Sequence, residues 1–145
     1  RERLRGMTGG AMEDTLIIIK PDAVERGLVG EIISRFEAAG FEIKRMDFRR
    51  PGENLIQRFY QEHRDKPHFG RLVKYMTSGA SCFVWLRREG AIERARELVG
   101  DTDPACAAAG TIRGDLGLDL PRNSVHASDC REAAATEIAL IFETL

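Results

Sequence analysis

The stretch that decides the fold is Thr15-Leu16-Ile17-Ile18-Ile19-Lys20-Pro21-Asp22. Its run of apolar, mostly β-branched residues is typical of a short strand buried within a sheet. Pro21 ends this strand, because the residue before a proline avoids the helical region of backbone conformations. The sequence therefore predicts a buried strand over residues 15–20, with the cation of Lys20 at its end.

Alternating helices and strands are predicted downstream of this strand. Apolar residues at helical spacing predict a helix over 30–40, and those between Phe41 and Phe48 indicate a second strand with a register break near Lys44. Then follow two short helices over 55–60 and 69–76, a strand over 81–86, a helix over 89–99, a strand over 123–126 and a helix over 129–145. This order favours an α+β sandwich, a sheet with helices covering one face.

The segment before the last predicted helix differs from the rest. Residues 101–121 show no clear period, and they contain Pro104 and several glycines. A loop of this length inside a compact domain is usually functional. The helix that follows starts with Asp129 and Glu132 at the spacing of a capping box, which predicts that Asp129 caps it.

The composition is that of one ordinary globular domain, with 43% hydrophobic and 31% charged residues among 145. The net charge of -1 provides no global positive field for nucleic acid. Residues 1–12 are polar and contain glycine, so we expect a flexible extension ahead of a domain over 13–145. Cys82, Cys106 and Cys130 are widely spaced, which suits free thiols in a reducing cytoplasm. The sequence contains no apolar run of about 18 residues, which is the length that would predict a membrane-spanning helix.

Familiar phosphate-binding motifs are missing. Neither GxxxxGK[ST] nor GxGxxG occurs in the chain. His63-Arg64-Asp65 matches part of a protein-kinase catalytic loop, but the downstream asparagine, glycine-rich loop and DFG segment of that class do not accompany it. A phosphate site would therefore have to come from a local cluster of basic residues.

A candidate nucleophile lies in the segment Asn123-Ser124-Val125-His126-Ala127-Ser128-Asp129. Imidazole can act as a nucleophile when one ring nitrogen is free and an acceptor holds the other. The small residues after His126 leave room for a phosphate, and the start of the next helix would bring backbone N–H groups near it. By pattern alone a histidine before a helix is more often structural than catalytic, so a structural role and a role as nucleophile both stay open for His126.

Candidate phosphate-binding cations lie in three separate segments. Lys20 follows the first strand, Arg96 lies near the end of a predicted helix, and Arg113 lies in the loop over 101–121. Arginine binds phosphate oxygens through a fork of donors, and lysine neutralises them as a point charge. Most such residues are solvated surface charges, and periodicity cannot bring these segments together in space.

Longer motifs decide between these alternatives. They are Ile19-Lys20-Pro21-Asp22, Arg26-Gly27-Leu28-Val29-Gly30-Glu31-Ile32, Leu72-Val73-Lys74-Tyr75-Met76, Ser78-Gly79 and Gly110-Thr111-Ile112-Arg113-Gly114-Asp115. Together with the histidine segment, which matches N-x-x-H-[GA]-S-D, they resemble the nucleoside diphosphate kinase family from about Thr15 to Phe142. The resemblance implies a ferredoxin-like βαββαβ fold, with a four-stranded antiparallel sheet and helices on one face.

The resemblance also implies a ping-pong reaction. A nucleoside triphosphate would phosphorylate His126 and leave as the diphosphate, and a second nucleoside diphosphate would take the phosphoryl group. Glu137 would hydrogen-bond the far imidazole nitrogen, with Ser128 close by. The other positions that match the nucleotide site of the family are Lys20, Tyr60, His68, Leu72, Arg96, Thr102, Arg113 and Asn123.

Within this set, the resemblance assigns Lys20 and Asn123 to the ribose hydroxyls and the terminal phosphate, and Lys20 and Tyr60 to catalysis as well. Arg96, Thr102 and Arg113 would hold the β- and γ-phosphates. Mg²⁺ would arrive with the nucleotide rather than occupy a metal site of the protein. The expected partners are nucleoside di- and triphosphates and further copies of this chain, with a hexamer favoured over a tetramer.

One position departs from the family. His68 stands where the family usually carries a phenylalanine that stacks on the base. Imidazole offers less apolar area than a phenyl ring and titrates near neutral pH. We therefore expect weaker base stacking and a pH-dependent KM for the nucleotide.

Two other functions compete with that of a kinase. Ferredoxin-like domains also bind RNA, but the net charge and the lack of an aromatic RNA-binding strand argue against sequence-specific nucleic-acid binding. A catalytically weak relative that acts as a nucleotide- or nucleic-acid-binding module is the remaining alternative, and the full set of motif residues argues against it.

Overall fold

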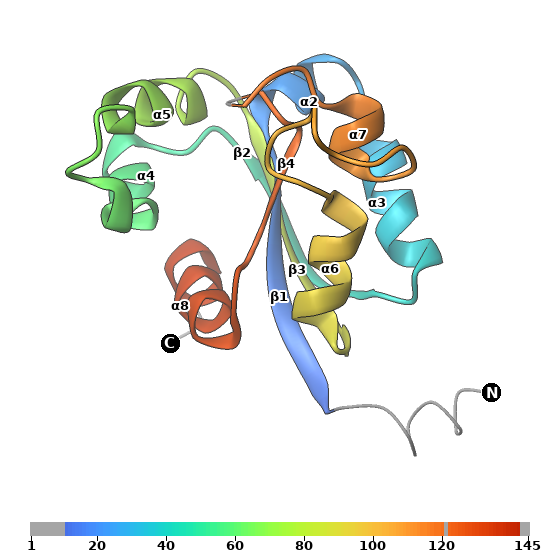
Figure 1. Cartoon of the computed structure of the whole chain (residues 1–145). Helices are drawn as coiled ribbons and strands as arrows, with labels where there is room; N and C mark the ends of the chain where they lie inside the picture. The colour runs from blue at the N-terminus through green and yellow to red at the C-terminus, as the bar shows by residue number, and fades with distance from the viewer. Residues whose placement is uncertain (1–10, 121, 143–145) are drawn as a thin grey trace.

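The computed structural model describes residues 11–120 and 122–142. Its centre is a four-stranded antiparallel sheet in the order β2-β3-β1-β4 (Figure 1). The strands are β1 (Met12–Ile19), β2 (Glu42–Arg49), β3 (Ser81–Glu89) and β4 (Val125–Ala127). With a helix after β1 and another after β3, this is the expected ferredoxin-like βαββαβ arrangement, which is confirmed.

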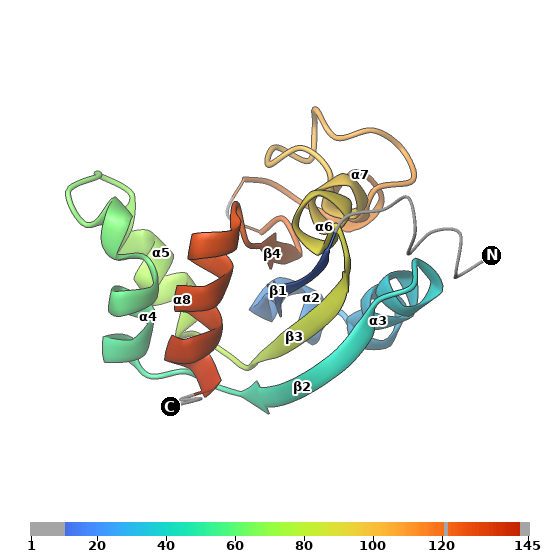
Figure 2. The ribbon, with the colours of Figure 1, turned by 90° about the horizontal axis from the view of Figure 1, so that it is seen from below.

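Helices pack on both faces of this sheet. They are α2 (Pro21–Glu25), α3 (Val29–Ala38), α4 (Glu53–Phe59), the 3-10 helix η1 (Gln61–His63), α5 (Phe69–Met76), α6 (Ala91–Val99), α7 (Ile112–Leu116) and α8 (Arg131–Phe142). Viewed along the sheet, α4, α5 and α8 lie on one side and α3 and α6 on the other (Figure 2). The expectation that helices cover one face only is therefore wrong.

Strand β1 shows why both faces are covered. Leu16, Ile17, Ile18 and Ile19 are all 0% exposed. Because side chains alternate along a strand, Ile17 and Ile19 belong to the core cluster beneath α3 and α6, whereas Leu16 and Ile18 belong to the cluster beneath α4, α5 and α8. A run of four apolar residues can be buried only if each face of the sheet has its own layer of helices.

Most predicted elements are found with shifted ends. β1 begins at Met12 because its pairing with β3 continues to Glu89. The register break predicted near Lys44 is confirmed, since the pairing of β2 with β3 shifts between Ile43 and Arg45. Three short helices were not predicted: α2, which has Pro21 in its first turn, the 3-10 helix η1, and α7, which lies within the loop over 101–121.

The ends of the chain limit two predictions. Residues 1–10 of the expected extension and residues 143–145 of the last predicted helix lie outside the described residues. Met12, the last residue of the expected extension, is already part of β1. No helix in the described part of the chain is long and apolar enough to cross a membrane.

The pairing of β4 with β1 brings together segments that lie more than 100 residues apart in the sequence. In its register His126 lies opposite Ile18, and the N–H of Lys20 donates to the carbonyl of Ser124 over 2.9 Å. Residues that pair across antiparallel strands point to the same face of a sheet. His126 therefore points to the face of Ile18, which α4, α5 and α8 cover.

Candidate active site

A cavity of about 770 Å³ lies beside the carboxyl end of β1 and the edge strand β4. Side chains from β4 and from every helix except α2 and α3 line it. Among them are nearly all the predicted site residues, namely Lys20, Tyr60, His68, Leu72, Arg96, Thr102, Arg113, Asn123, His126 and Glu137. The fold thus brings together segments that the sequence pattern alone could not connect.

The imidazole of His126 is held by a carboxylate. Its Nε2 lies 3.2 Å from Oε1 of Glu137, and the two side chains are 19% and 16% exposed. A carboxylate accepts hydrogen bonds, so this contact places the ring proton on Nε2 and leaves the lone pair on Nδ1. The ring of Phe59 packs edge-on to the imidazole at 5.2 Å between ring centres, which further limits its rotation.

Ser128 lies behind the cavity rather than in its wall. It is 0% exposed, and its hydroxyl donates to the same Oε1 of Glu137 over 2.7 Å. The backbone N–H of Leu16 in turn donates to this hydroxyl over 3.3 Å. Ser128 therefore anchors Glu137 to the sheet and does not itself reach the cavity.

The backbone just before His126 is strained. The N–H of Val125 donates to the carbonyl of Asn123 over 3.0 Å, which closes a γ-turn around Ser124. Ser124 has φ 79°, the one non-glycine residue with positive φ among those described. It is also 0% exposed, and its hydroxyl has no hydrogen-bond partner there. Such strain costs about 1–3 kcal/mol and persists only where the surroundings enforce it, most often at functional sites.

Lys20 and Asn123 form a buried pair at the floor of the cavity. Nζ of Lys20 donates to Oδ1 of Asn123 over 2.8 Å, and Nδ2 of Asn123 donates to the carbonyl of Thr102 over 3.0 Å. Burial, followed by the charge of Arg113, lowers the pKa of Lys20 to about 8, while Asp22 acts in the opposite direction. The partner of this ammonium is neutral, so its charge is available to an anion.

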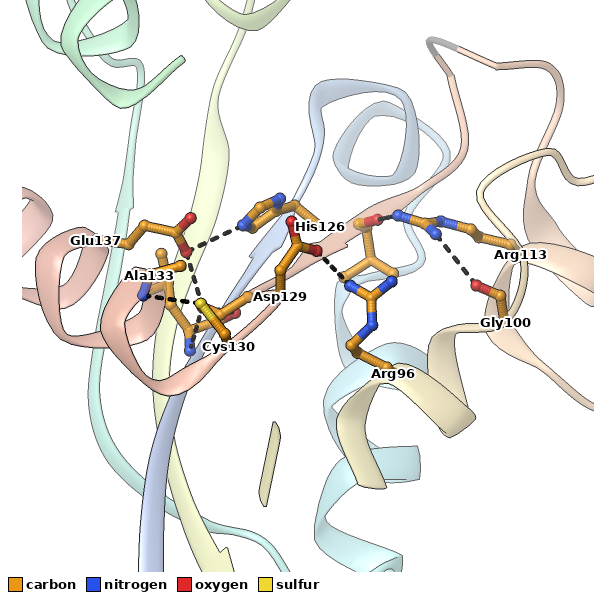
Figure 3. A network of polar contacts seen from close by, with 11 residues as sticks. Arg96, Gly100, Arg113, His126, Asp129, Cys130, Ala133 and Glu137 are labelled. Carbon is orange, nitrogen blue, oxygen red and sulfur yellow. Dashed lines mark hydrogen bonds and ion pairs between the residues drawn. The ribbon is translucent and has the colours of Figure 1, made fainter. Parts of the chain in front are cut away.

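Arg113 is a second buried cation without a carboxylate partner. Its guanidinium donates to the carbonyls of Gly100 over 3.1 Å and of Val125 over 2.9 Å (Figure 3). Burial, followed by the charge of Arg96, lowers the pKa of Arg113 to about 10. Its Nε, which is buried, has no hydrogen-bond partner among the described residues. Burial is the main cause of both lowered pKa values, and the second cause in each case is a neighbouring arginine, so Lys20, Arg113 and Arg96 lie close together here.

Arg96 differs from the other two cations because it has an acidic partner. Its guanidinium forms an ion pair with Oδ1 of Asp129 over 2.5 Å (Figure 3). The predicted capping by Asp129 is therefore wrong, since α8 starts at Arg131 and the sulfur of Cys130 accepts the N–H of Ala133 over 3.4 Å. The physical reason is that the tertiary contact with Arg96 draws the carboxylate away from the helix end.

Aromatic rings surround the far end of the cavity. His63 and His68 pack edge to face with 5.4 Å between ring centres, and His63 lies 6.1 Å from the ring of Tyr60. Tyr60 is 9% exposed, and burial, followed by the charge of Glu137, raises the pKa of its phenol well above its usual range. Its hydroxyl therefore stays protonated, and it has no hydrogen-bond partner among the described residues. In the described part of the chain this leaves one buried donor without an acceptor, within reach of the charges of Glu137 and Arg113.

Some cavity residues were missed by the sequence analysis. Phe59, Glu62, His63 and Arg71 also line the cavity, as does Asp129, which was assigned a different role. His63 lies in a 3-10 turn that has no sequence signature, and the other contacts form only when α4 and α5 pack beside α8. In residues 11–120 and 122–142, no three His, Cys, Asp or Glu side chains group to hold a metal ion.

The fold and this cavity define a class of protein: an α+β domain that presents a hydrogen-bonded histidine and excess positive charge to a phosphorylated ligand. A model of the family described as nucleoside diphosphate kinase matches residues 13–145. Nucleoside diphosphate kinases of Desulfatibacillum aliphaticivorans and Rubrobacter xylanophilus are 50% and 49% identical over 131 residues, which are 90% of this chain and 95% and 98% of those proteins.

Solved structures agree with this assignment. The nucleoside diphosphate kinase of Aquifex aeolicus superposes with a TM-score of 0.89 at 43% identity, over 91% of this chain and 96% of that chain. That of Halobacterium salinarum, in complex with CDP, gives 0.89 at 42% identity, over 92% of this chain and 89% of that chain. The chain belongs to the nucleoside diphosphate kinase family, as its motifs predicted.

Proposed function

We propose that this chain transfers the γ-phosphoryl group of a nucleoside triphosphate to a nucleoside diphosphate through a phosphohistidine on His126. The observation that carries the proposal is the imidazole itself, which Glu137 holds at 3.2 Å in the wall of a cavity rich in positive charge. Nδ1 of His126 attacks the γ-phosphorus, and the bond from this phosphorus to the β,γ-bridging oxygen breaks. The diphosphate leaves, and a second diphosphate takes the phosphoryl group by the reverse of this step.

Glu137 and Ser128 act through the imidazole. Phosphorylation of Nδ1 places positive charge on the ring, and the carboxylate of Glu137 stabilises that charge through the Nε2–H bond. Ser128 keeps Glu137 in place with its 2.7 Å hydrogen bond. Ser128 is thus a positioning residue.

The basic residues hold the phosphates. A loose phosphoryl transition state needs positioning and cationic stabilisation more than acid–base catalysis. Lys20 and Asn123 serve the terminal phosphate and the ribose hydroxyls, while Arg96, Thr102 and Arg113 serve the β- and γ-phosphates. The unsatisfied donors on Tyr60 and Arg113 support this assignment, because a phosphate would supply the missing acceptors.

His68 and Leu72 hold the base. Both line the cavity, and the ring of His68 packs against that of His63. The ligands are nucleoside di- and triphosphates, and the CDP complex of the Halobacterium salinarum relative supports this choice. Mg²⁺ would enter with the nucleotide and would offset the negative charge of its phosphates.

The protein functions as a homo-oligomer in the cytoplasm, with a hexamer favoured over a tetramer. Support comes from β2, which lies at an edge of the sheet and exposes 52% of Met46 and 59% of Phe48. Burial of such apolar side chains favours association. The free thiols Cys82, Cys106 and Cys130 suit a reducing compartment. Light scattering of the purified protein gives the number of subunits directly.

The decisive experiment is incubation with γ-labelled ATP and Mg²⁺, followed by a stability test of the labelled protein. We expect a label that is lost in acid, is retained in base, and is absent from His126→Ala. His63→Ala is the matched control, because it removes another cavity histidine and should keep the label. An unlabelled wild-type protein, or a label that survives in His126→Ala, would overturn the proposal.

A further inference from the structure

The three cations of the cavity differ in what neutralises them. Lys20 pairs with an amide oxygen and Arg113 with two backbone carbonyls. Within the described residues only Arg96 of these three forms an ion pair with a carboxylate, that of Asp129 (Figure 3). The phosphate site is thus partly occupied by an anion that belongs to the chain.

Asp129 has no evident structural task that would explain this contact. Its side chain is 80% exposed, and Cys130 supplies the hydrogen-bond acceptor at the start of α8. Its field nevertheless reaches the phosphate site beyond Arg96, because its negative charge also raises the pKa of Arg113, against the larger effect of burial.

We propose that Asp129 is an internal competitor for the nucleotide: it occupies Arg96 in the empty protein and is displaced when a polyphosphate binds. The inference rests on the proposed function, because it takes Arg96 as a phosphate ligand. Carboxylate and phosphate oxygens both accept hydrogen bonds from the guanidinium fork, so they compete for the same donors. Two anions on one guanidinium also repel each other, and the exposed Asp129 can turn out to solvent.

Competition of this kind lowers the affinity of the protein for the nucleotide and speeds the release of the nucleotide. Each half of a ping-pong reaction ends with the departure of a nucleotide that still carries its α- and β-phosphates for the cations to hold. A carboxylate that returns to Arg96 favours that departure. Asp129 is therefore a positioning residue that sets how tightly Arg96 holds phosphate.

Substitution of Asp129 by asparagine tests the proposal, because it removes the charge and keeps the shape. We expect the Kd of MgADP, measured by calorimetry, to fall about two- to fivefold, the range of an exposed ion pair. The KM for the diphosphate should fall by a similar factor, whereas kcat should stay equal or fall as release slows. A merely structural role would instead raise KM, or leave both the Kd of MgADP and the KM for the diphosphate unchanged.

Three further variants make the test specific. Asp129→Glu restores the carboxylate and should restore the wild-type Kd. Glu132→Gln removes an equal charge from an exposed position in the first turn of α8 and should leave the Kd unchanged. In an Arg96→Met background, Asp129→Asn should no longer tighten binding, because the residue through which Asp129 acts is gone.

The outcomes separate this inference from the proposed function. Wild-type protein that fails to bind MgADP would refute the function itself. If the wild-type protein binds and Asp129→Asn binds equally or more weakly, the function stands and the competition is refuted. The competition would also be refuted if Glu132→Gln tightened the binding of MgADP as much as Asp129→Asn does, or if Asp129→Asn still tightened it fully in the Arg96→Met background. The effect would then come from the net charge and not from the contact with Arg96.

Discussion

Raising the pH from 7 to 9 should weaken the binding of nucleoside diphosphate through Lys20. The residue is 7% exposed, and the pKa of its ammonium group is lowered to about 8 by burial and by the neighbouring charge of Arg113. In the empty protein Lys20 therefore loses most of its charge between pH 7 and pH 9. A bound polyphosphate restores a high pKa, because an adjacent anion favours the charged form of lysine.

The size of the effect follows from this difference in pKa. Above the pKa of the empty protein, binding must be accompanied by the uptake of a proton, so the apparent Kd rises with pH. For a pKa of about 8 the Kd of MgADP should rise about tenfold from pH 7 to pH 9, equivalent to roughly 1.4 kcal/mol. Below pH 7 Lys20 is already charged, and it contributes no further change.

Calorimetry at pH 7, 8 and 9 and constant ionic strength measures this directly. Buffers of different ionisation enthalpy report the expected proton uptake. Lys20→Met is the control, because it removes the titrating amine: it should bind more weakly at pH 7 and show a flat profile. A wild-type Kd that changes by less than about twofold, or an equal change in Lys20→Met, would refute the reasoning.

Three other perturbations have defined outcomes. Glu137→Gln should lower kcat about 10- to 100-fold in a coupled assay, because an amide cannot neutralise the charge that develops on the imidazole; unchanged kcat would exclude that role. Ser124→Gly should raise the free energy of unfolding by about 1 kcal/mol in calorimetric melting, since it relieves a φ of 79° and removes an unpartnered hydroxyl, and a lower melting temperature would contradict this. His68→Phe should lower the KM for the nucleotide, because a phenyl ring offers the base more apolar area than an imidazole, and a KM equal to that of the wild type would exclude base stacking at this position.

Much of the fold could be predicted because it depends on short-range patterns. The run Leu16 to Ile19 predicts a buried strand whatever its tertiary surroundings. The register break near Lys44 is visible because the alternation of apolar and polar residues is interrupted there. The motif around His126 was equally visible. Local patterns failed where one residue can act in two ways, as at Pro21, which ends the strand as expected but also lies in the first turn of α2, a helix that was not predicted.

The site itself depended on family motifs, because local pattern left each residue ambiguous. By local pattern alone, a histidine placed like His126 is more often structural than catalytic. Lys20, Arg96 and Arg113 were three charges in separate segments, with nothing in the pattern to bring them together. Their convergence in one cavity follows from pairing of β1 with β4 and from the packing of helices on both faces of the sheet.

The sequence by itself determined the strands, the family and the identity of the candidate nucleophile, since these depend on residue order alone. The tertiary structure decided which groups meet: Lys20 and Asn123, 103 residues apart, touch only after β4 pairs beside β1. It also decided that Asp129 pairs with Arg96 rather than capping α8. The physical reason is that a helix cap is satisfied within a few residues, whereas the ion pair forms only when the fold brings α6 beside the segment that joins β4 to α8.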